Sequence, residues 1–196
     1  MKFGIIVMKI VDVDSEIIHR LRESGLSREM KSLENCDFLV ILEHNNKIIA
    51  ASGIGGLFHV PSLQIHQDYQ NKGLGGKLLN VVMEEAKKRK YSFISGSRNP
   101  ENLNAVRLHD FFKLLPVFQI KYRQDFTRDV VILALNRRGK CVRGFLKIFN
   151  TLLGTVVLVI SIKIFRKFLF RFLLTYPPEE FPSPDVRYAI RNFRKI

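Results

Sequence analysis

Cysteine, tryptophan and acidic residues are scarce in this chain, and the shortages narrow its class. Cys36 and Cys141 are the only cysteines among 196 residues, and tryptophan is absent. Two cysteines without a pairing or cluster pattern argue against a disulfide framework and against a cysteine-ligated zinc site, and they favour a reducing, cytoplasmic setting. The five histidines show no metal-ligand spacing, so we expect no metal.

The shortage of acidic residues is concentrated toward the C-terminus. Residues 1–136 contain 19 Lys and Arg against 15 Asp and Glu, a net charge of +4, whereas residues 137–196 contain 13 against 3, a net charge of +10. With 46% apolar residues the chain can form one sizeable core with an appendage. Two full domains are not expected, and most of the basic excess belongs to the last 60 residues.

A glycine-rich loop is the most informative motif. Gly73, Gly75 and Gly76 lie between an apolar, strand-like run that includes Leu63 and Ile65 and an amphipathic helical pattern. Such a loop exposes main-chain N–H groups at the positive end of a helix dipole, where a pyrophosphate binds well. The alternative interpretation is an ordinary strand-to-helix turn that needs left-handed backbone angles.

Two motifs together resemble one enzyme family. Residues 63–79 resemble the acetyl-coenzyme A motif of GCN5-related N-acetyltransferases, in which Gln70, Gly73 and Gly75 fill the Arg/Gln-x-x-Gly-x-Gly/Ala core. Residues 99–109 are similar to the family's Asn-x-x-Ala-x-x-(Phe/Leu)-Tyr helix. Two motifs separated by one helix and one strand are more specific than either alone.

The resemblance implies a mixed α/β (α+β) acyltransferase fold, with a mostly antiparallel sheet flanked by helices. It implies an N-acetyltransferase domain over residues 8–136, preceded by an extension or an early start over residues 1–7 and followed by a basic, hydrophobic tail over residues 137–196. Residues 3–7 are too short an apolar stretch for a secretory signal.

The resemblance also implies acetyl-CoA as the acyl donor and places its binding residues. Main-chain N–H groups between Asn71 and Lys77 would hold the pyrophosphate, while Leu63 and Ile65 would offer main-chain hydrogen bonds to the pantetheine arm. Asn102 would contact the arm, or it serves only as a helix-opening residue that satisfies free N–H groups. The predicted cofactor-binding residues are Leu63, Ile65, Gln70, Asn71, Lys72, Gly73, Leu74, Gly75, Gly76, Lys77 and Asn102.

The catalytic residue is harder to place. His109 stands where the family usually has a tyrosine that protonates the departing thiolate; an imidazole can donate a proton, but it can equally pack on a helix. Tyr122 is a second donor without motif support. No residue identifies itself as the general base, although Glu43, His59 and His66 lie on or near predicted central strands.

The periodicity predicts alternating strands and helices in the order β-α-α-β-β-β-α-β-α-β-β. A hairpin is expected at Asn45-Asn46, a turn over residues 53–56, and a helix stopped by Pro116. The predicted strands cover residues 5–13, 37–43, 47–52, 58–66, 92–97, 117–123 and 130–135, and the predicted helices cover residues 15–23, 27–33, 76–90 and 102–115.

The tail predicts a membrane-associated helix over residues 145–174, followed by a short basic helix near residues 186–194. Residues 148–162 are uncharged and mostly apolar, but they are fewer than the ~18–20 residues needed to cross a bilayer. The next turns carry basic residues on an amphipathic pattern suited to an anionic membrane surface. We favour membrane association over docking onto the core or a second subunit, and over nucleic acid, for which no motif is evident.

Together these features predict a cytoplasmic N-acetyltransferase that acts on a primary amine, held on the cytosolic face of a membrane. A homodimer is compatible with this interpretation. One alternative is a catalytically silent acyl-CoA sensor or adaptor, suggested by His109 and the missing base; another is an acyltransferase that uses a longer acyl-CoA. The sequence does not identify the amine acceptor.

Overall fold

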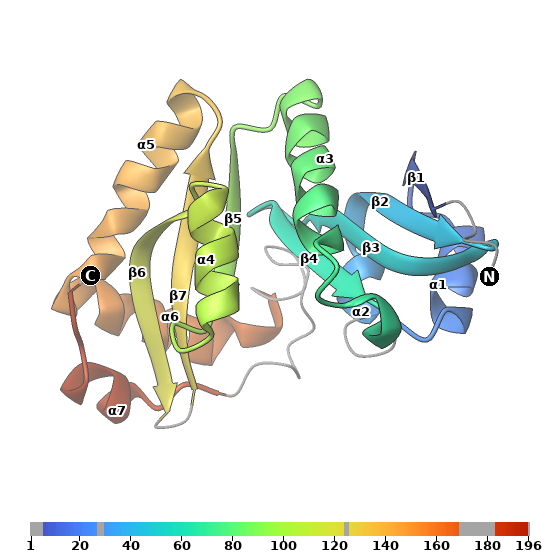
Figure 1. Cartoon of the computed structure of the whole chain (residues 1–196). Coiled ribbons are helices and arrows are strands. Elements are labelled where there is room, and N and C mark those ends of the chain that lie inside the picture. The colour runs from blue at the N-terminus through green and yellow to red at the C-terminus, as the bar shows by residue number, and fades with distance from the viewer. Residues whose placement is uncertain (1–5, 27–29, 124–125, 169–182, 196) are drawn as a thin grey trace. The chain divides into compact units, whose positions relative to one another are not determined.

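The computed structural model describes residues 6–26, 30–123, 126–168 and 183–195, which form two units (Figure 1). The first unit runs to Lys90 and the second begins at Tyr91. All strand pairs are antiparallel, in a four-stranded sheet ordered β1-β2-β3-β4 and a three-stranded sheet ordered β5-β7-β6. The predicted α/β class and the predicted order of elements are confirmed.

The first unit contains β1 (Ile6–Val11), α1 (Ser15–Glu23), α2 (Met30–Glu34), β2 (Cys36–His44), β3 (Lys47–Gly55), β4 (Val60–Ile65), a 3-10 turn η1 (Gln67–Tyr69) and α3 (Leu74–Lys88). Local sequence explains several boundaries. Asp14 caps α1 by accepting a hydrogen bond from the Ile17 N–H at 2.8 Å. Asn45 and Asn46 have φ of 52° and 62°, the left-handed angles that a two-residue hairpin requires.

Helices cover both faces of the first sheet. Residues of α1 and α2 cluster with Leu39 and Ile41 of β2, so their neighbours Phe38 and Val40 point to the other face. There the Arg89 guanidinium, at the end of α3, lies 4.5 Å from the centre of the Phe38 ring. Every residue of β3 from Ile48 to Gly55 is buried, which makes this strand the centre of the unit.

One predicted turn and one predicted helix end were wrong. The predicted turn over residues 53–56 is instead strand up to Gly55, and the chain turns over residues 56–59. Gly53 lies beside an irregularity in β2, where a Cβ would come 2.2 Å from the Phe38 oxygen, so the glycine serves close backbone approach. Pro116 does not stop a helix; it lies in β6, an edge strand, where its missing N–H is tolerated at a register shift.

The second unit contains β5 (Phe93–Arg98), α4 (Leu103–Phe111), β6 (Leu115–Arg123), β7 (Phe126–Ala134), α5 (Arg137–Leu146), a 3-10 turn η2 (Lys147–Asn150), α6 (Leu152–Phe168) and α7 (Val186–Arg191). Helix α4 ends at Phe111 because Lys113 adopts a φ of 58° and the Leu114 N–H bonds to the His109 oxygen at 2.9 Å. Figure 1 shows α4 in front of these strands and α6 behind them.

The basic tail packs onto this second sheet. Gly139 of α5 approaches β5 so closely that a Cβ would come 1.9 Å from the Ser92 oxygen. The Phe149 ring meets the Phe118 ring edge to face at 5.5 Å between centroids. Leu146 of α5, Val159 and Ile162 of α6 and Ala189 of α7 are buried.

The helix predicted over residues 145–174 is interrupted where the structure describes it. The chain leaves α5 through η2 and bends by 97° into α6, and residues 169–174 lie outside the described residues. Among the described residues, no single helix has the length and apolarity to cross a membrane. The bent pair of residues 137–150 and 152–168 meets that test only together, and only by length and composition.

Candidate functional site

The glycine loop begins α3 with an N-terminus that carries no side-chain cap. Gly73 is the N-cap residue, with a left-handed φ of 73°. The first intrahelical bond is donated by the Lys77 N–H to the Gly73 oxygen at 3.4 Å, so the N–H groups of Leu74, Gly75 and Gly76 precede the helical ladder. A Cβ at Gly73 or Gly76 would meet nothing within 4 Å. The loop therefore presents accessible main-chain donors at the positive end of a helix of 15 residues.

Gly75 brings the loop against the two residues predicted on the neighbouring strand. A Cβ at Gly75 would lie 3.3 Å from Ile65 Cδ1 and 3.3 Å from Leu63 Cδ2. The closeness requires a very small side chain at this position, because a larger one would push both neighbours aside. Leu63, Ile65 and Gly75, which were predicted to bind different parts of the cofactor, thus lie together.

Strand β4 is the edge of its sheet and leaves main-chain groups on its open side. Its ladder with β3 includes a bond from the His66 N–H to the Ile49 oxygen at 2.8 Å. In an antiparallel ladder successive residues alternate between the two sides. Leu63 and Ile65 therefore direct their main-chain N–H and C=O groups away from β3, as an extended ligand pairing along this edge would need.

Side chains of the loop form hydrogen bonds with the main chain of β4 and η1, just before the glycines. Gln70 Nε2 donates to the Ile65 oxygen at 3.1 Å. Lys72 Nζ donates to the Asp68 oxygen at 2.8 Å and lies 4.9 Å from the centre of the Tyr69 ring. Asn71 has a left-handed φ of 59°, and Asn71 and Lys77 are exposed. The predicted loop residues thus lie at the start of α3, where Leu74 is buried and Asn71, Lys72, Gly73 and Lys77 are exposed.

The sequence did not indicate the contact between Tyr69 and His44. The Tyr69 hydroxyl lies 2.7 Å from His44 Nδ1, a hydrogen bond between residues 25 positions apart. The bond fixes η1, which immediately precedes the glycine loop, to the end of β2. No local pattern could have indicated it, because the pairing depends on how β2 and β4 are registered in the sheet.

Asn102 and His109 belong to α4, in the second unit. Asn102 caps the helix, its Oδ1 accepting a hydrogen bond from the Ala105 N–H at 3.1 Å, so the structural role weighed for it is present. The His109 imidazole packs beside β5, where a Cβ at Gly96 would lie 3.9 Å from its Cε1. Its Nδ1 is buried, without a hydrogen-bond partner among the residues that the structure describes.

His109 is neutral at pH 7. Burial first, and then the positive charge of Arg98, lower the pKa of His109 to about 4, against an upward effect of Asp110. A pKa near 4 leaves only about one imidazole in a thousand protonated at pH 7. The thiolate-acid role predicted for His109 remains a hypothesis that must work from this small population.

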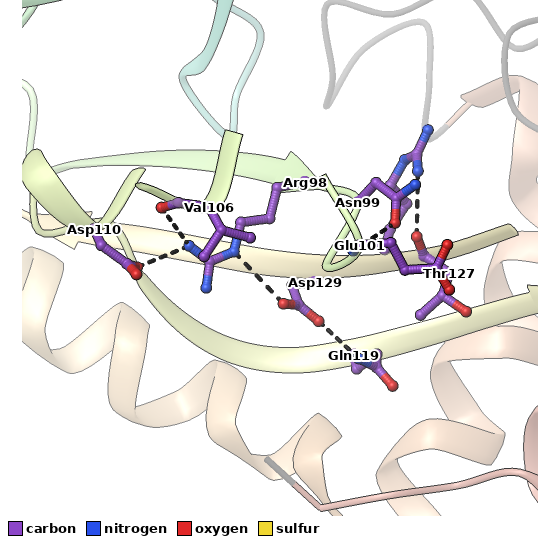
Figure 2. A network of polar contacts seen from close by, with 9 residues as sticks. Arg98, Asn99, Glu101, Val106, Asp110, Gln119, Thr127 and Asp129 are labelled. Atoms are coloured by element: carbon purple, nitrogen blue, oxygen red, sulfur yellow. Dashed lines mark hydrogen bonds and ion pairs between the residues drawn. The ribbon is translucent and has the colours of Figure 1, made fainter. Parts of the chain in front are cut away.

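A partly buried ionic network holds α4 to the sheet. Figure 2 shows Arg98 of β5 between Asp110 of α4 and Asp129 of β7, with Gln119 of β6 beyond. Arg98 Nη1 donates to Asp110 Oδ1 at 2.8 Å and to the Val106 oxygen at 3.3 Å, and its Nε lies 3.5 Å from Asp129 Oδ2. Gln119 Nε2 completes the network by donating to Asp129 Oδ1 at 2.8 Å. The network fixes the helix that carries Asn102 and His109.

The general-base candidates have structural partners. Glu43 is buried and forms ion pairs with Lys9 and Arg20. Although burial favours its neutral form, the hydrogen bonds and charges of these two cations hold the pKa of Glu43 below its usual range. His66 Nδ1 accepts from the Asp68 N–H at 3.4 Å as the cap of η1. His59 lies in the turn before β4 with a φ of 50°, and burial lowers its pKa.

No metal site accompanies this surface. Within the described residues there is no group of three or more His, Cys, Asp or Glu side chains that could hold an ion. Burial raises the pKa of the Cys36 thiol to about 12, which makes it unreactive.

Comparison with known proteins identifies the class. The model of the acetyltransferase (GNAT) family matches residues 9–112, which include both motifs and the surface around Gly73. The chain therefore belongs to the GNAT family, and acyl transfer is the class of activity that this family implies. No match is found among curated proteins.

Solved structures share the fold at low sequence identity. The Salmonella typhimurium protein yncA, solved with acetyl-CoA as its cofactor, is 17% identical, with a TM-score of 0.50 over 67% of this chain and 95% of that one. The ribosomal-protein-S18-alanine N-acetyltransferase of Escherichia coli is 18% identical, with a TM-score of 0.51 over 66% and 93%. A chain of the NatC complex bound to Gag peptide and CoA is 16% identical, with a TM-score of 0.56 over 67% and 99%.

Proposed function

We propose that the protein transfers the acetyl group of acetyl-CoA to a primary amine by direct attack within a ternary complex. The observation that carries this proposal is the uncapped start of α3 at Gly73 beside the open edge of β4. One surface thus offers main-chain donors for a pyrophosphate and, next to them, a strand edge for an extended arm. Acetyl-CoA has both parts, and yncA, with the same fold, was solved with it.

Each predicted cofactor-binding residue has a role in this proposal. The main-chain N–H groups between Asn71 and Lys77 bind the pyrophosphate, and exposed Lys72 and Lys77 add positive charge beside it. Leu63 and Ile65 pair with the arm through their main-chain groups. Gln70 holds the loop to the strand. Asn102 contacts the arm through the part of its amide that does not cap α4.

The reaction needs no covalent enzyme intermediate. The amine nitrogen attacks the thioester carbonyl carbon, its lone pair forms the C–N bond, and the tetrahedral oxyanion collapses by breaking the C–S bond. The ammonium proton passes to water and the coenzyme A thiolate takes up a proton. Since the base candidates are engaged in the fold, an amine that arrives deprotonated, or a water chain, removes the need for a dedicated base.

A second candidate is an acyl-CoA sensor that binds without turnover. It is favoured by the neutral His109 at the position of the family's tyrosine and by the ion pairs that occupy Glu43. A third is an acyltransferase that uses a longer acyl-CoA. The same assay, run with acetyl and longer acyl donors, separates all three.

The test is thiol release from acetyl-CoA by the full chain across a panel of primary amines. Gly75→Val is the variant, because its side chain would push against Leu63 and Ile65. Gly144→Val is the matched control, because Gly144 is an exposed residue of α5 and a Cβ there meets nothing within 4 Å. Amine-dependent release that is lost in Gly75→Val and kept in Gly144→Val is expected. Binding of acetyl-CoA without release by any amine would favour the sensor and overturn the transferase.

A further inference from the structure

Helix α6 has two apolar faces, and only one is packed. Val159 and Ile162 are buried against the rest of the second unit, together with Gly154 and Thr155. The opposite face carries large apolar residues at intervals of four, three, four and four positions, which places them in one stripe along the helix. They are Leu153, Val157, Ile160, Ile164 and Phe168, between 40% and 75% exposed.

More exposed apolar residues lie at the bend before α6. Phe145 of α5, Ile148 of η2 and Leu152 at the start of α6 are each at least half exposed. These eight large apolar side chains lie on one short, bent segment, on which Phe165 of α6 is exposed as well. A monomer rarely exposes so many together unless they meet a partner or a membrane. We call these eight residues the apolar stripe.

The charge of the same segment is entirely of one sign. Residues 137–168 contain eight Lys and Arg and no Asp or Glu. Lys163 and Lys167 follow Ile160 and Ile164 at i+3, so they lie beside the apolar stripe on exposed positions of α6. Arg137, Arg138, Lys140 and Lys147 are exposed on α5 and η2.

We propose that the apolar stripe and the cations beside it bind the surface of a bilayer that contains anionic phospholipids. The stripe enters the boundary between headgroups and acyl chains, and the lysines and arginines remain at the phosphate level. The bend of 97° and the charged end of α6 fit a segment that lies on the membrane better than one that crosses it. This inference goes beyond the acetyl transfer proposed above and does not depend on it.

Charge decides between this partner and two others. A second copy docked through the same surface would bring two segments of eight cations together with no acidic residue to pair them. A nucleic acid would neutralise the cations but would leave the aliphatic side chains of the apolar stripe exposed to water. An anionic bilayer satisfies both sets.

The experiment is sedimentation of the full chain with phosphatidylcholine vesicles, with and without phosphatidylglycerol. The apolar variant is Leu153→Glu with Ile164→Glu, two exposed positions of α6. Leu57→Glu, 66% exposed in the turn before β4, is its control. The charge variant is Lys163→Gln with Lys167→Gln, and its control is Lys87→Gln with Lys88→Gln on exposed positions of α3. Circular dichroism verifies that each variant is folded.

Binding to the anionic vesicles alone is expected, with a loss of about tenfold or more in the apolar variant and roughly fivefold per lysine in the charge variant. Both controls should bind as the wild type does. The proposal is overturned if the chain stays in the supernatant, or if binding survives the apolar variant. It is also overturned if size-exclusion chromatography without lipid shows a dimer that the apolar variant dissociates, which would assign the surface to a second copy.

Discussion

Gln70 donates a hydrogen bond from its side-chain nitrogen to the main-chain oxygen of Ile65, 3.1 Å away. The bond ties the first residue of the predicted binding motif to the open edge of β4, five positions earlier. It therefore sets the position of the loop relative to the strand on which we expect the pantetheine arm to lie.

Gln70→Ala should weaken acetyl-CoA binding by about two- to tenfold, the effect of one hydrogen bond of ~0.5–1.5 kcal/mol. The measurement is the dissociation constant by calorimetry. Gln67→Ala is the control, because that side chain is exposed on η1, where its main chain accepts from the Gln70 N–H. Unchanged binding in Gln70→Ala would show that the loop keeps its position without this bond.

The fold should lose stability as pH falls, through His109. The pKa of His109 is about 4 in the fold because of burial and then the charge of Arg98, whereas an unfolded histidine titrates near pH ~6.5. Between these values the unfolded state binds the additional proton, so the contribution is complete above pH ~6.5 and is lost as pH falls toward 4. From pH 7 to 5 we expect a loss of roughly 1–2 kcal/mol.

His109→Gln cannot titrate and should flatten this dependence in urea unfolding measured at pH 7 and pH 5. His19→Gln is the control, because the His19 side chain is 72% exposed. The same preparation gives kcat, and a retained kcat would remove His109 from proton transfer to the thiolate. Equal pH dependence in wild type and His109→Gln would refute the burial argument.

The two carboxylates around Arg98 should differ in their effect on stability. Asp129 is buried and is shared between Arg98 and Gln119, whereas the Asp110 side chain is 56% exposed. Asp129→Asn should lower the free energy of unfolding by about 2–4 kcal/mol, because it removes the buried negative charge that compensates the buried Arg98 guanidinium. Asp110→Asn should cost less than about 1 kcal/mol. Equal losses in chemical denaturation would contradict this order.

Two glycines of α5 test whether the tail packs on the second sheet in solution. Gly139→Ala places a methyl group 1.9 Å from the Ser92 oxygen and should destabilise the protein by about 2 kcal/mol or more, since backbone must move. Gly144→Ala enters open space on the same helix and should stabilise it by about 0.5–1 kcal/mol. Thermal unfolding compares them, and similar melting temperatures would mean that α5 does not pack against β5.

Much of the fold could be predicted from local patterns because its boundaries are marked by residues with strong backbone preferences. Asn45 and Asn46 marked a hairpin correctly. Gly53 led to a wrong turn prediction and Pro116 to a wrong helix end, because glycine and proline often mark turns and helix ends. Their actual roles depend on the sheets: Gly53 allows close approach to the main chain of Phe38, and Pro116 lies in the edge strand β6. The same limit hid the bend of the tail, since residues 148–162 are uncharged and mostly apolar, with no charged residue to mark a break.

For the candidate site, the linear motif indicated residues that lie near one another but not their polar partners. Gly73 is the N-cap residue of α3, and Gly75 lies against the Leu63 and Ile65 side chains. The bond between Tyr69 and His44 and the network of Arg98 join residues from different strands, so they depend on register. The ion pairs that occupy Glu43 were likewise beyond a local pattern.

The most direct measurement is calorimetric titration of the full chain with acetyl-CoA, in wild type, Gly75→Val and Gly144→Val. We expect saturable binding at one site in wild type and Gly144→Val, and binding at least about tenfold weaker in Gly75→Val, in which the new side chain pushes against Leu63 and Ile65. Absence of binding in wild type, or equal binding in all three, would contradict the assignment of the glycine loop as the acetyl-CoA site.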